Sequence, residues 1–196
     1  MEALQALTSR ESVSPRHLGP PAPSAAEREA AFRAAMAAPD HGALRPWRFL
    51  VVEGEGLHRL GEVFAEAARR AKPDADPAVI ESAREKALRS PLLIVAAAVV
   101  KHEGTKIPPI EQIIATGCAT QNLLNAFHAM GYGAMLLTGE RAYDPGVKTA
   151  LGLAEGDHIV AFMHVGTPGA ERPEKRKARP ELAHHVRSWP DSAARR

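Results

Sequence analysis

The nine residues from Leu92 to Val100 are apolar at every position. A run without alternation between apolar and polar residues is typical of a strand that is buried on both faces. Such a strand needs a covering layer on each side, so the rest of the chain must supply two further layers. The run is also far short of the ~20 residues that a membrane-spanning helix needs. It therefore predicts the central strand of a layered, soluble domain.

The rest of the chain alternates between patterns typical of helices and of strands. Apolar residues at helical spacing predict helices, and short apolar runs bounded by turn residues predict strands. We expect helices over 1–8, 25–37, 55–70, 77–88 and 110–132 and from Pro145 onwards, and further strands over 47–53, 133–137 and 159–165. This alternation predicts a sandwich of class α+β or α/β, in which helices cover a sheet.

The longest expected helix, 110–132, combines an apolar stripe with a polar face. We expect the stripe to consist of Ile110, Ile113, Ile114, Gly117, Leu124 and Phe127. The other face carries Gln121, Asn122 and Asn125, which favours packing against an interface that contains polar groups. The segment 131–133, Gly-Tyr-Gly, either caps the helix C-terminus or allows a close approach of another segment.

Charge does not point to a nucleic-acid or membrane partner. The chain has 196 residues, 45 % of them hydrophobic, and a formal net charge of +2. The charge is uneven: residues 171–196 contain 8 Lys or Arg and 4 Asp or Glu, which is +4 and leaves −2 for the remainder. This basic extension is typical of a solvated tail, although it could also bind an anion or an RNA.

Cysteine and leader signals indicate a cytoplasmic protein. Cys118 is the only cysteine, so the chain cannot form an internal disulfide, and its apolar neighbours favour a buried, unreactive thiol. No basic segment followed by an apolar one begins the chain, so we expect no signal peptide.

The histidines do not predict a metal site. His184 and His185 are adjacent, so their side chains would diverge on a helix, and His158 and His164 are expected on one face of a strand. Histidines spaced in this way are more often hydrogen-bonded structural residues. The chain also lacks a Walker loop, a His-Glu-x-x-His motif, paired cysteines and a Gly-x-Ser-x-Gly elbow.

A candidate anion site lies near the N-terminus. Arg10, Glu11 and Ser12 stand where the first helix is expected to end. A guanidinium, a hydroxyl and free backbone N–H groups together suit a phosphate, which binds several charge-assisted donors at once. Alternatively, Arg10 only complements the dipole of the helix C-terminus.

A second segment gives this reading a context. Residues 38–49 read Ala-Pro-Asp-His-Gly-Ala-Leu-Arg-Pro-Trp-Arg-Phe, which is a helix end, a polar turn and the start of a strand. Together with Arg10 and Ser12, and in this order, the segment resembles the nitroreductase family of flavoenzymes, and its small single-domain branch most closely. Further matching segments are 106–108, 111–112, 117–119, 131–133 and 166–168. The resemblance runs in register over most of residues 1–168.

The resemblance implies a fold and an activity. The fold would be a three-layer α/β/α sandwich of class α+β with a central mixed sheet, and the protein would be a homodimer with FMN at the subunit interface. Residues 1–169 would form the FMN-binding domain, and 170–196 a basic extension that could pack on the partner subunit. NADH or NADPH would reduce the flavin, and a small oxidant such as a nitroaromatic or a quinone would reoxidise it. Flavin N5 would carry the chemistry, so no catalytic side chain and no metal is expected.

The resemblance also assigns residues to the cofactor site. Arg10, Glu11 and Ser12 would line the phosphate and ribityl side. Ala37 and His41, at the end of the second helix, would approach the flavin from the partner subunit. Leu136, Leu137 and Thr138 would form a wall at the end of a strand.

Two departures from the family pattern bear on this assignment. Glu11 stands where a basic residue is usual, so we expect its carboxylate to point away, with Arg16 or the basic extension restoring positive charge. Leu136 and Leu137 make the wall apolar. Two alternatives stay open: a flavin-less binding or regulatory protein on the same fold, and a flavoenzyme that acts on flavin or on a dedicated metabolite.

Overall fold

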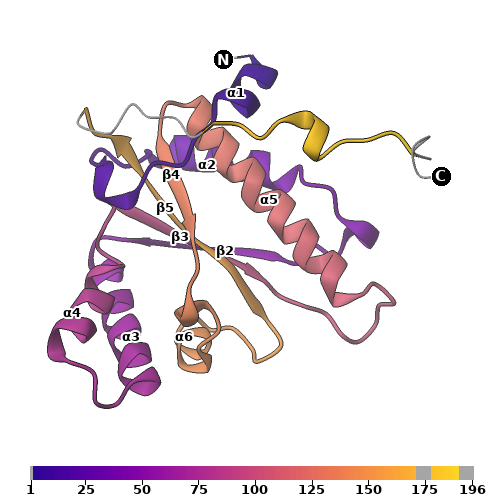
Figure 1. Ribbon diagram of the computed structural model, residues 1–196. Coiled ribbons are helices and arrows are strands. Elements are labelled where there is room, and N and C mark those ends of the chain that lie inside the picture. The colour runs from indigo at the N-terminus through magenta and orange to yellow at the C-terminus, as the bar shows by residue number, and fades with distance from the viewer. Residues whose placement is uncertain (1, 171–177, 190–196) are drawn as a thin grey trace, which may run out of the picture.

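The apolar run forms the centre of the sheet, as expected. The computed structural model describes residues 2–170 and 178–189 (Figure 1). In it, β3 (Leu92–Ala98) is buried at every position. It pairs antiparallel with β2 (Trp47–Glu53) on one side and with β5 (His158–Pro168) on the other, and the β3–β5 register shifts between Ala96 and Ala97. A strand buried on both faces requires a covering layer on each side of the sheet, and helices supply both layers.

The two remaining strands, β4 (Gly133–Leu137) and β1 (Leu18–Gly19), both pair antiparallel with β5. Every strand pairing among the described residues is therefore antiparallel, and the expectation of a mixed sheet is wrong there. The reason is the placement of β5. Strands β3 and β4 run in the same direction, but β5 lies between them in the opposite direction, so they do not pair with each other.

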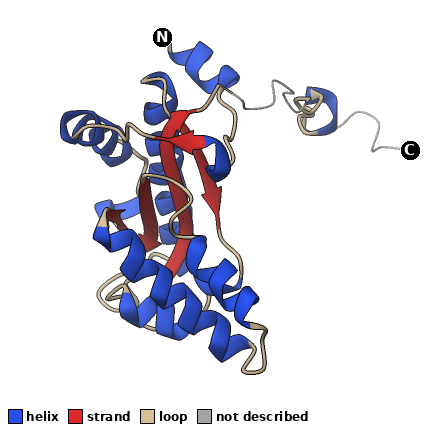
Figure 2. Ribbon diagram, turned by 90° about the vertical axis from the view of Figure 1, so that its left-hand side faces the viewer, coloured by secondary structure: helices blue, strands red, loops and turns tan. Residues whose placement is uncertain are grey.

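Helices cover both faces of the sheet, which confirms the three-layer α+β sandwich (Figure 2). On one face, α2 (Ala25–Met36) and α5 (Pro109–Ala129) pack on a core that includes Trp47 and Phe127. The opposite face is covered by α3 (Glu55–Ala71) and α6 (Pro145–Ala150), whose core includes Phe64 and Phe162. The helix α4 (Pro77–Glu85) packs on α3.

Local sequence signals account for several helix starts. Ser24 and Glu27 form the reciprocal capping box at the start of α2. The carboxylates of Asp76 and Asp144 accept backbone N–H bonds at the starts of α4 and α6, each of which has proline at its first position. These caps satisfy donors that the first helical turn leaves unpaired.

The orientation of α5 differs from the expectation. Leu124 and Phe127 are buried, but Ile110 and Ile114 are 59 % and 58 % exposed. The face of α5 that packs on the sheet consists instead of small and medium residues, among them Ala115, Ala119 and Leu123. Since small side chains let the helix approach the sheet closely, the isoleucines turn outwards at the spacing i, i+4. The exposed face of α5 is therefore apolar at its N-terminal end.

Both readings of the 131–133 segment are correct, at different residues. Gly131 has φ +91° and its N–H donates to the carbonyl of His128, which ends α5 as a glycine C-cap does. Gly133 starts β4 where a Cβ would lie 2.7 Å from Leu18 and 3.0 Å from Val13. Gly133 thus permits the close approach of the N-terminal segment to β4.

The start of the C-terminal segment 178–189 lies beside the N-terminal helix. The N-terminal helix is α1 (Ala3–Ser9), and Arg179 donates to the carbonyl oxygens of Thr8 and Arg10. Beyond Arg179 the described chain stands away from the domain and contains one 3-10 turn, η4 (Leu182–His184) (Figure 2). Residues 171–177 and 190–196 of the basic extension lie outside the described residues. No helix in the described ranges is long and apolar enough to cross a membrane.

Candidate functional site

The Arg10–Ser12 segment leaves α1 and runs onto β4. Helix α1 ends at Ser9, and Arg10 has the extended conformation φ −57°, ψ 131°. Three residues later the N–H of Val13 donates to the carbonyl of Ala134, 3.1 Å away. The chain directly after the predicted phosphate-binding residues therefore lies beside the start of β4, and the residues of the predicted wall, 136–138, follow at the other end of that strand.

Arg10 carries a buried donor with no partner. Its Nη1 is buried and makes no hydrogen bond to any described residue. Burial lowers the pKa of Arg10, the charge of Arg179 lowers it further, and the charge of Glu11 offsets part of this effect. The negative charge of Glu11 therefore acts on the guanidinium of Arg10. Ser12 is exposed and Ser14 half-exposed beside it.

Consecutive residues at the end of β4 point to opposite faces of the sheet, so Leu136 and Leu137 do not form one wall as expected. Leu136 is 36 % exposed and pairs with Met163 on the α5 side, whereas Leu137 pairs with Phe162 on the α3 side. Among the described strands β4 pairs only with β5, so the backbone groups on its other edge beyond Ala134 are available to a ligand. Thr138 follows as an exposed residue, and Gly139, with φ +84°, turns the chain into η3 (Glu140–Ala142).

His41 lies in a strained turn that follows α2. This turn, η2 (His41–Ala43), is held by the carboxylate of Asp40, which accepts the N–H of Arg45 at 2.6 Å. Ala43 and Arg45 have φ of 51° and 50°, which is rare for residues with a side chain. Asp40 therefore holds the turn, while His41 is exposed.

His41 makes a contact that the sequence analysis did not predict. Its Nδ1 lies 2.7 Å from Oε2 of Glu111, in the first turn of α5. Glu111 and Gln112 entered the sequence analysis only as part of the family pattern. The buried Gln112 bonds to Lys101 and Ile107 and so fixes the loop beside His41. A glutamine in an apolar helical stripe is the signal that could have indicated this role.

The Arg10 and His41 groups of predicted site residues lie at opposite ends of α5. His41 contacts Glu111 at the start of the helix, and Ala37 is exposed at the end of α2. The Arg10 group lies at the other end, where Oγ of Ser9 is 2.9 Å from Nε2 of His128. A helix of 21 residues is about 31 Å long. One protomer therefore does not bring the two groups together.

The strand histidines are structural or exposed. His164 is fully buried, and its Nδ1–H donates to Oγ of Ser90 at 2.8 Å, because the Ser90 hydroxyl is used on the carbonyl of Leu92. Burial, followed by the charges of Arg141 and Arg89, lowers the pKa of His164 to about 4. His158 is exposed, and the register shift between the two residues breaks the expected alternation. Within the described ranges, no three His, Cys, Asp or Glu side chains come together as a metal site would require.

Comparison with known proteins identifies the family. The model of the Nitroreductase family matches residues 7–167. The chain belongs to this family. It is 38 % identical to the Escherichia coli K12 protein named "Putative NAD(P)H nitroreductase YdjA" over 168 residues, which covers 86 % of this chain and 89 % of YdjA.

Solved structures show the same fold. A nitroreductase-like family protein from Bacillus cereus superposes with a TM-score of 0.78 at 25 % identity, covering 97 % of both chains. A nitroreductase from Bacteroides fragilis, solved with bound FMN, superposes with a TM-score of 0.71 at 20 % identity and covers 96 % of this chain and 98 % of its own. The architecture is therefore that of a nitroreductase.

Proposed function

We propose that the protein is an FMN-dependent oxidoreductase that uses NADH or NADPH to reduce a nitroaromatic, a quinone or a related small oxidant. The observation that carries this proposal is the buried Nη1 of Arg10, which has no partner among the described residues beside an open strand edge. A buried guanidinium donor without a hydrogen-bond partner destabilises the folded protein unless a bound anion accepts its hydrogen bond. Membership of the nitroreductase family and the FMN bound by the Bacteroides relative support FMN as the source of that anion.

The residues present fit this cofactor. Arg10 and the hydroxyl of Ser12 supply donors for the phosphate and ribityl chain, and Glu11 contributes its backbone there. Leu136 supplies an exposed apolar side chain to a flat ring system, and the free edge of β4 near Thr138 offers backbone groups to its polar rim.

Each residue group would have a distinct role in the reaction. When bound, FMN would supply the redox chemistry that links the reduced nicotinamide to the oxidant in a ping-pong sequence. The chain's own groups would bind and orient the reactants: Arg10 would hold the phosphate, Leu136 would exclude water from one side, and His41 would offer an imidazole nitrogen at the other. None of these steps needs a side chain to form a covalent bond.

The proposed assembly is a homodimer built on the exposed face of α5. Ile110 and Ile114 lie on this face, and a Cβ built on Gly117 would meet nothing within 4 Å. An apolar stripe next to a glycine is typical of a helix that packs closely against another. The segment 178–189 carries Leu182, Val186 and Trp189, which are 78, 67 and 93 % exposed, and we propose that it packs on the partner.

A two-fold axis would complete the site. In a symmetric dimer the same surface of each subunit faces its copy, so two α5 helices that cross antiparallel place the start of one beside the end of the other. The partner's His41 would then approach Arg10 of the first subunit, and the reverse, giving two flavin sites. This arrangement accounts for the separation of the two residue groups along α5.

The experiment is an FMN-binding and turnover assay. The purified protein is mixed with FMN, passed through gel filtration, and its visible absorbance and its oxidation of NADH and NADPH by a nitroaromatic are recorded. Arg10→Ala should lose FMN by roughly tenfold or more in affinity, since a charge-assisted contact contributes about 1.5–3 kcal/mol. Arg69→Ala, on the opposite face of the sheet, is the matched control and should retain FMN. Absence of flavin absorbance in the native protein would contradict the proposal.

A flavin-less binding protein is the second candidate, because Glu11 offsets the charge of Arg10 and Arg179 of the extension lies against it. It predicts weak FMN affinity and anion or RNA binding that falls with salt and disappears when residues after Gly169 are deleted. A flavoenzyme that acts on flavin or a dedicated metabolite would instead bind FMN and differ only in the products formed with NADH and oxygen.

A further inference from the structure

A cavity lies on the face of the sheet that α5 does not cover. It has a volume of about 480 Å³ and lies between α3, α4 and η3. One part of its wall is apolar and consists mainly of Phe64 and the alanines of α3 and α4, while Lys86 and Arg141 contribute positive charge. Volumes of this size are common for small-molecule sites.

Arg141 lacks a carboxylate partner in this cavity. Its guanidinium carbon lies 4.8 Å from the ring centre of Phe64 and 5.2 Å from that of Phe162. Its Nε is buried without a hydrogen bond, and it forms no ion pair with any described residue. Burial lowers the pKa of Arg141, and the charge of Arg89 lowers it further. The two rings hold the guanidinium of Arg141 in place, and a bound anion would pair with its positive charge.

Lys86 and Arg89 add to the same positive field. Burial lowers the pKa of Lys86, and repulsion from Arg141 and Arg89 lowers it further, while Glu140 opposes this effect. The other carboxylate in the lining, Asp144, is already used: it binds Arg70 at 2.6 Å and caps α6. Within the lining, Lys86 and Arg141 therefore stand against Glu140 alone, which leaves one positive charge in excess, and Arg89 adds to the positive field from outside the lining.

We propose that this cavity binds an aromatic carboxylate. The planar guanidinium of Arg141 matches a carboxylate, Lys86 supplies a second cation, and Phe64 with the alanine wall accommodates a ring. A ligand with a single negative charge fits better than a doubly charged phosphate ester, because Glu140 and Asp144 also face the cavity. The cavity lining includes Gly139, which directly follows the candidate flavin residue Thr138, so the test below is run both with and without FMN.

Calorimetric titration with benzoate tests the site, with benzamide as an uncharged ligand of the same shape. The full chain is titrated with and without saturating FMN. Benzoate should bind at least tenfold more tightly than benzamide, and this binding should persist in the presence of FMN and weaken with added salt.

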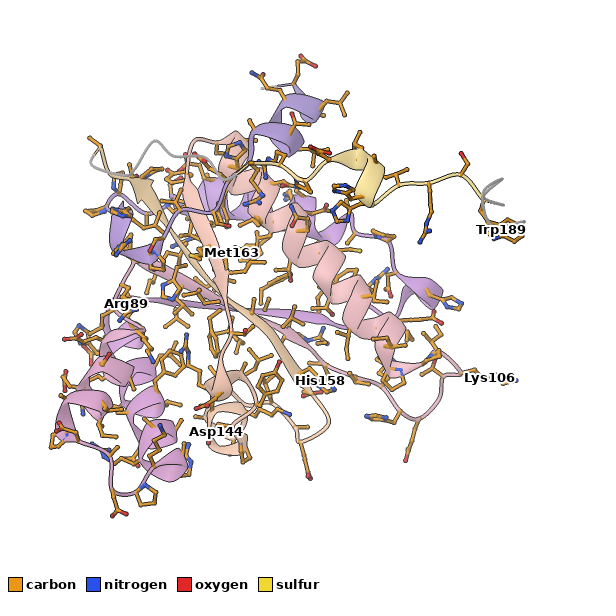
Figure 3. All side chains as sticks on the ribbon, in the orientation of Figure 1. Arg89, Lys106, Asp144, His158, Met163 and Trp189 are labelled. Carbon is orange, nitrogen blue, oxygen red and sulfur yellow. The ribbon has the colours of Figure 1, made fainter. Side chains whose placement is uncertain are left out.

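Charge-removing variants complete the test. Lys86→Gln should weaken benzoate at least tenfold without affecting benzamide, and Arg89→Gln, an exposed residue that cannot disturb the core, should weaken it severalfold. Lys106→Gln is the matched control, because Lys106 lies beyond the start of α5, far from Arg89 and Asp144 (Figure 3). This variant should bind benzoate as the native protein does. Equal affinity for benzoate and benzamide, native affinity in both variants, or loss of binding on FMN saturation would overturn the proposal.

Discussion

Nδ1 of His41 lies 2.7 Å from Oε2 of Glu111, and this contact joins the turn after α2 to the first turn of α5. The pair is exposed, with 68 % of the His41 side chain and 43 % of the Glu111 side chain accessible. An exposed pair adds little to stability, so its value lies in fixing the imidazole. With Nδ1 engaged by the carboxylate, Nε2 stays available to a ligand.

Glu111→Gln should therefore reduce activity without unfolding the protein. We expect the melting temperature to change by less than about 2 °C, because exposed pairs contribute below about 1 kcal/mol. The rate of nitroaromatic reduction should fall by roughly three- to tenfold, since His41 loses its orienting carboxylate. Steady-state kinetics and thermal melting measure the two effects. Glu103→Gln, in the neighbouring loop, is the control, and equal kinetics in both variants would exclude an orienting role for Glu111.

Ile114→Glu should convert the dimer into a monomer. The side chain is 58 % exposed on the apolar face of α5, where a carboxylate would be buried against the partner. Light scattering after gel filtration gives the mass directly. Val79→Glu on α4 is the matched control, because Val79 is also exposed, at 50 %, but lies away from α5. If the Ile114→Glu variant were still a dimer, the dimer interface would not lie on this face of α5.

Asp144→Ala should destabilise the protein by about 1–3 kcal/mol, because it removes both a helix cap and a partner of Arg70. The carboxylate accepts the N–H of Val147 at 2.8 Å, and the side chain is only 16 % exposed. Asp144→Asn retains an oxygen for the cap and should lose less. Urea unfolding at pH 7 compares the two variants; equal losses would mean that the charge contributes nothing beyond the cap.

His164 should make the protein sensitive to mild acid. Burial holds the pKa of His164 at about 4, below its unfolded value near 6.5. Between these values the unfolded chain binds a proton that the folded chain does not, so the free energy of unfolding falls as pH decreases from about 6.5 to 4. The full effect is about 3 kcal/mol, at 1.36 kcal/mol per pKa unit.

Urea unfolding at pH 7 and pH 4 measures this contribution. The native protein should lose about 3 kcal/mol more over this range than His164→Gln, whatever the stability of the variant at pH 7. His158→Gln removes an exposed histidine from the same strand and should show the native pH dependence. A His164→Gln variant with that same dependence would contradict the assignment.

The four longer strands and most helix limits follow from the sequence because local signals determine them, whereas the two-residue strand β1 (Leu18–Gly19) does not. The apolar run 92–98, the Ser24–Glu27 capping box and the prolines after Asp76 and Asp144 each act within a few residues. The outward face of α5 does not follow, since isoleucine is equally compatible with a core and with an interface. Whether the isoleucines of α5 face the core or an interface depends on the small residues of the helix that pack on the sheet.

Contacts between distant segments explain the other differences. The His41–Glu111 pair spans 70 positions, and the position of β5 between β3 and β4 depends on the whole topology. Arg141 follows β4 along the chain, yet it contacts aromatic rings from α3 and β5, which are distant in sequence. Composition and spacing do not contain this information.

Subunit mixing tests most directly whether Arg10 and His41 serve one flavin site from two subunits. Arg10→Ala and His41→Ala are co-expressed with different tags, and the mixed dimer is isolated by both tags. In the proposed dimer one site collects both substitutions and the other collects neither, so the mixed dimer should recover about half of the native FMN content and activity. If each protomer formed its own site, every site would carry one substitution, and the mixed dimer would show only the low values of the two parent variants.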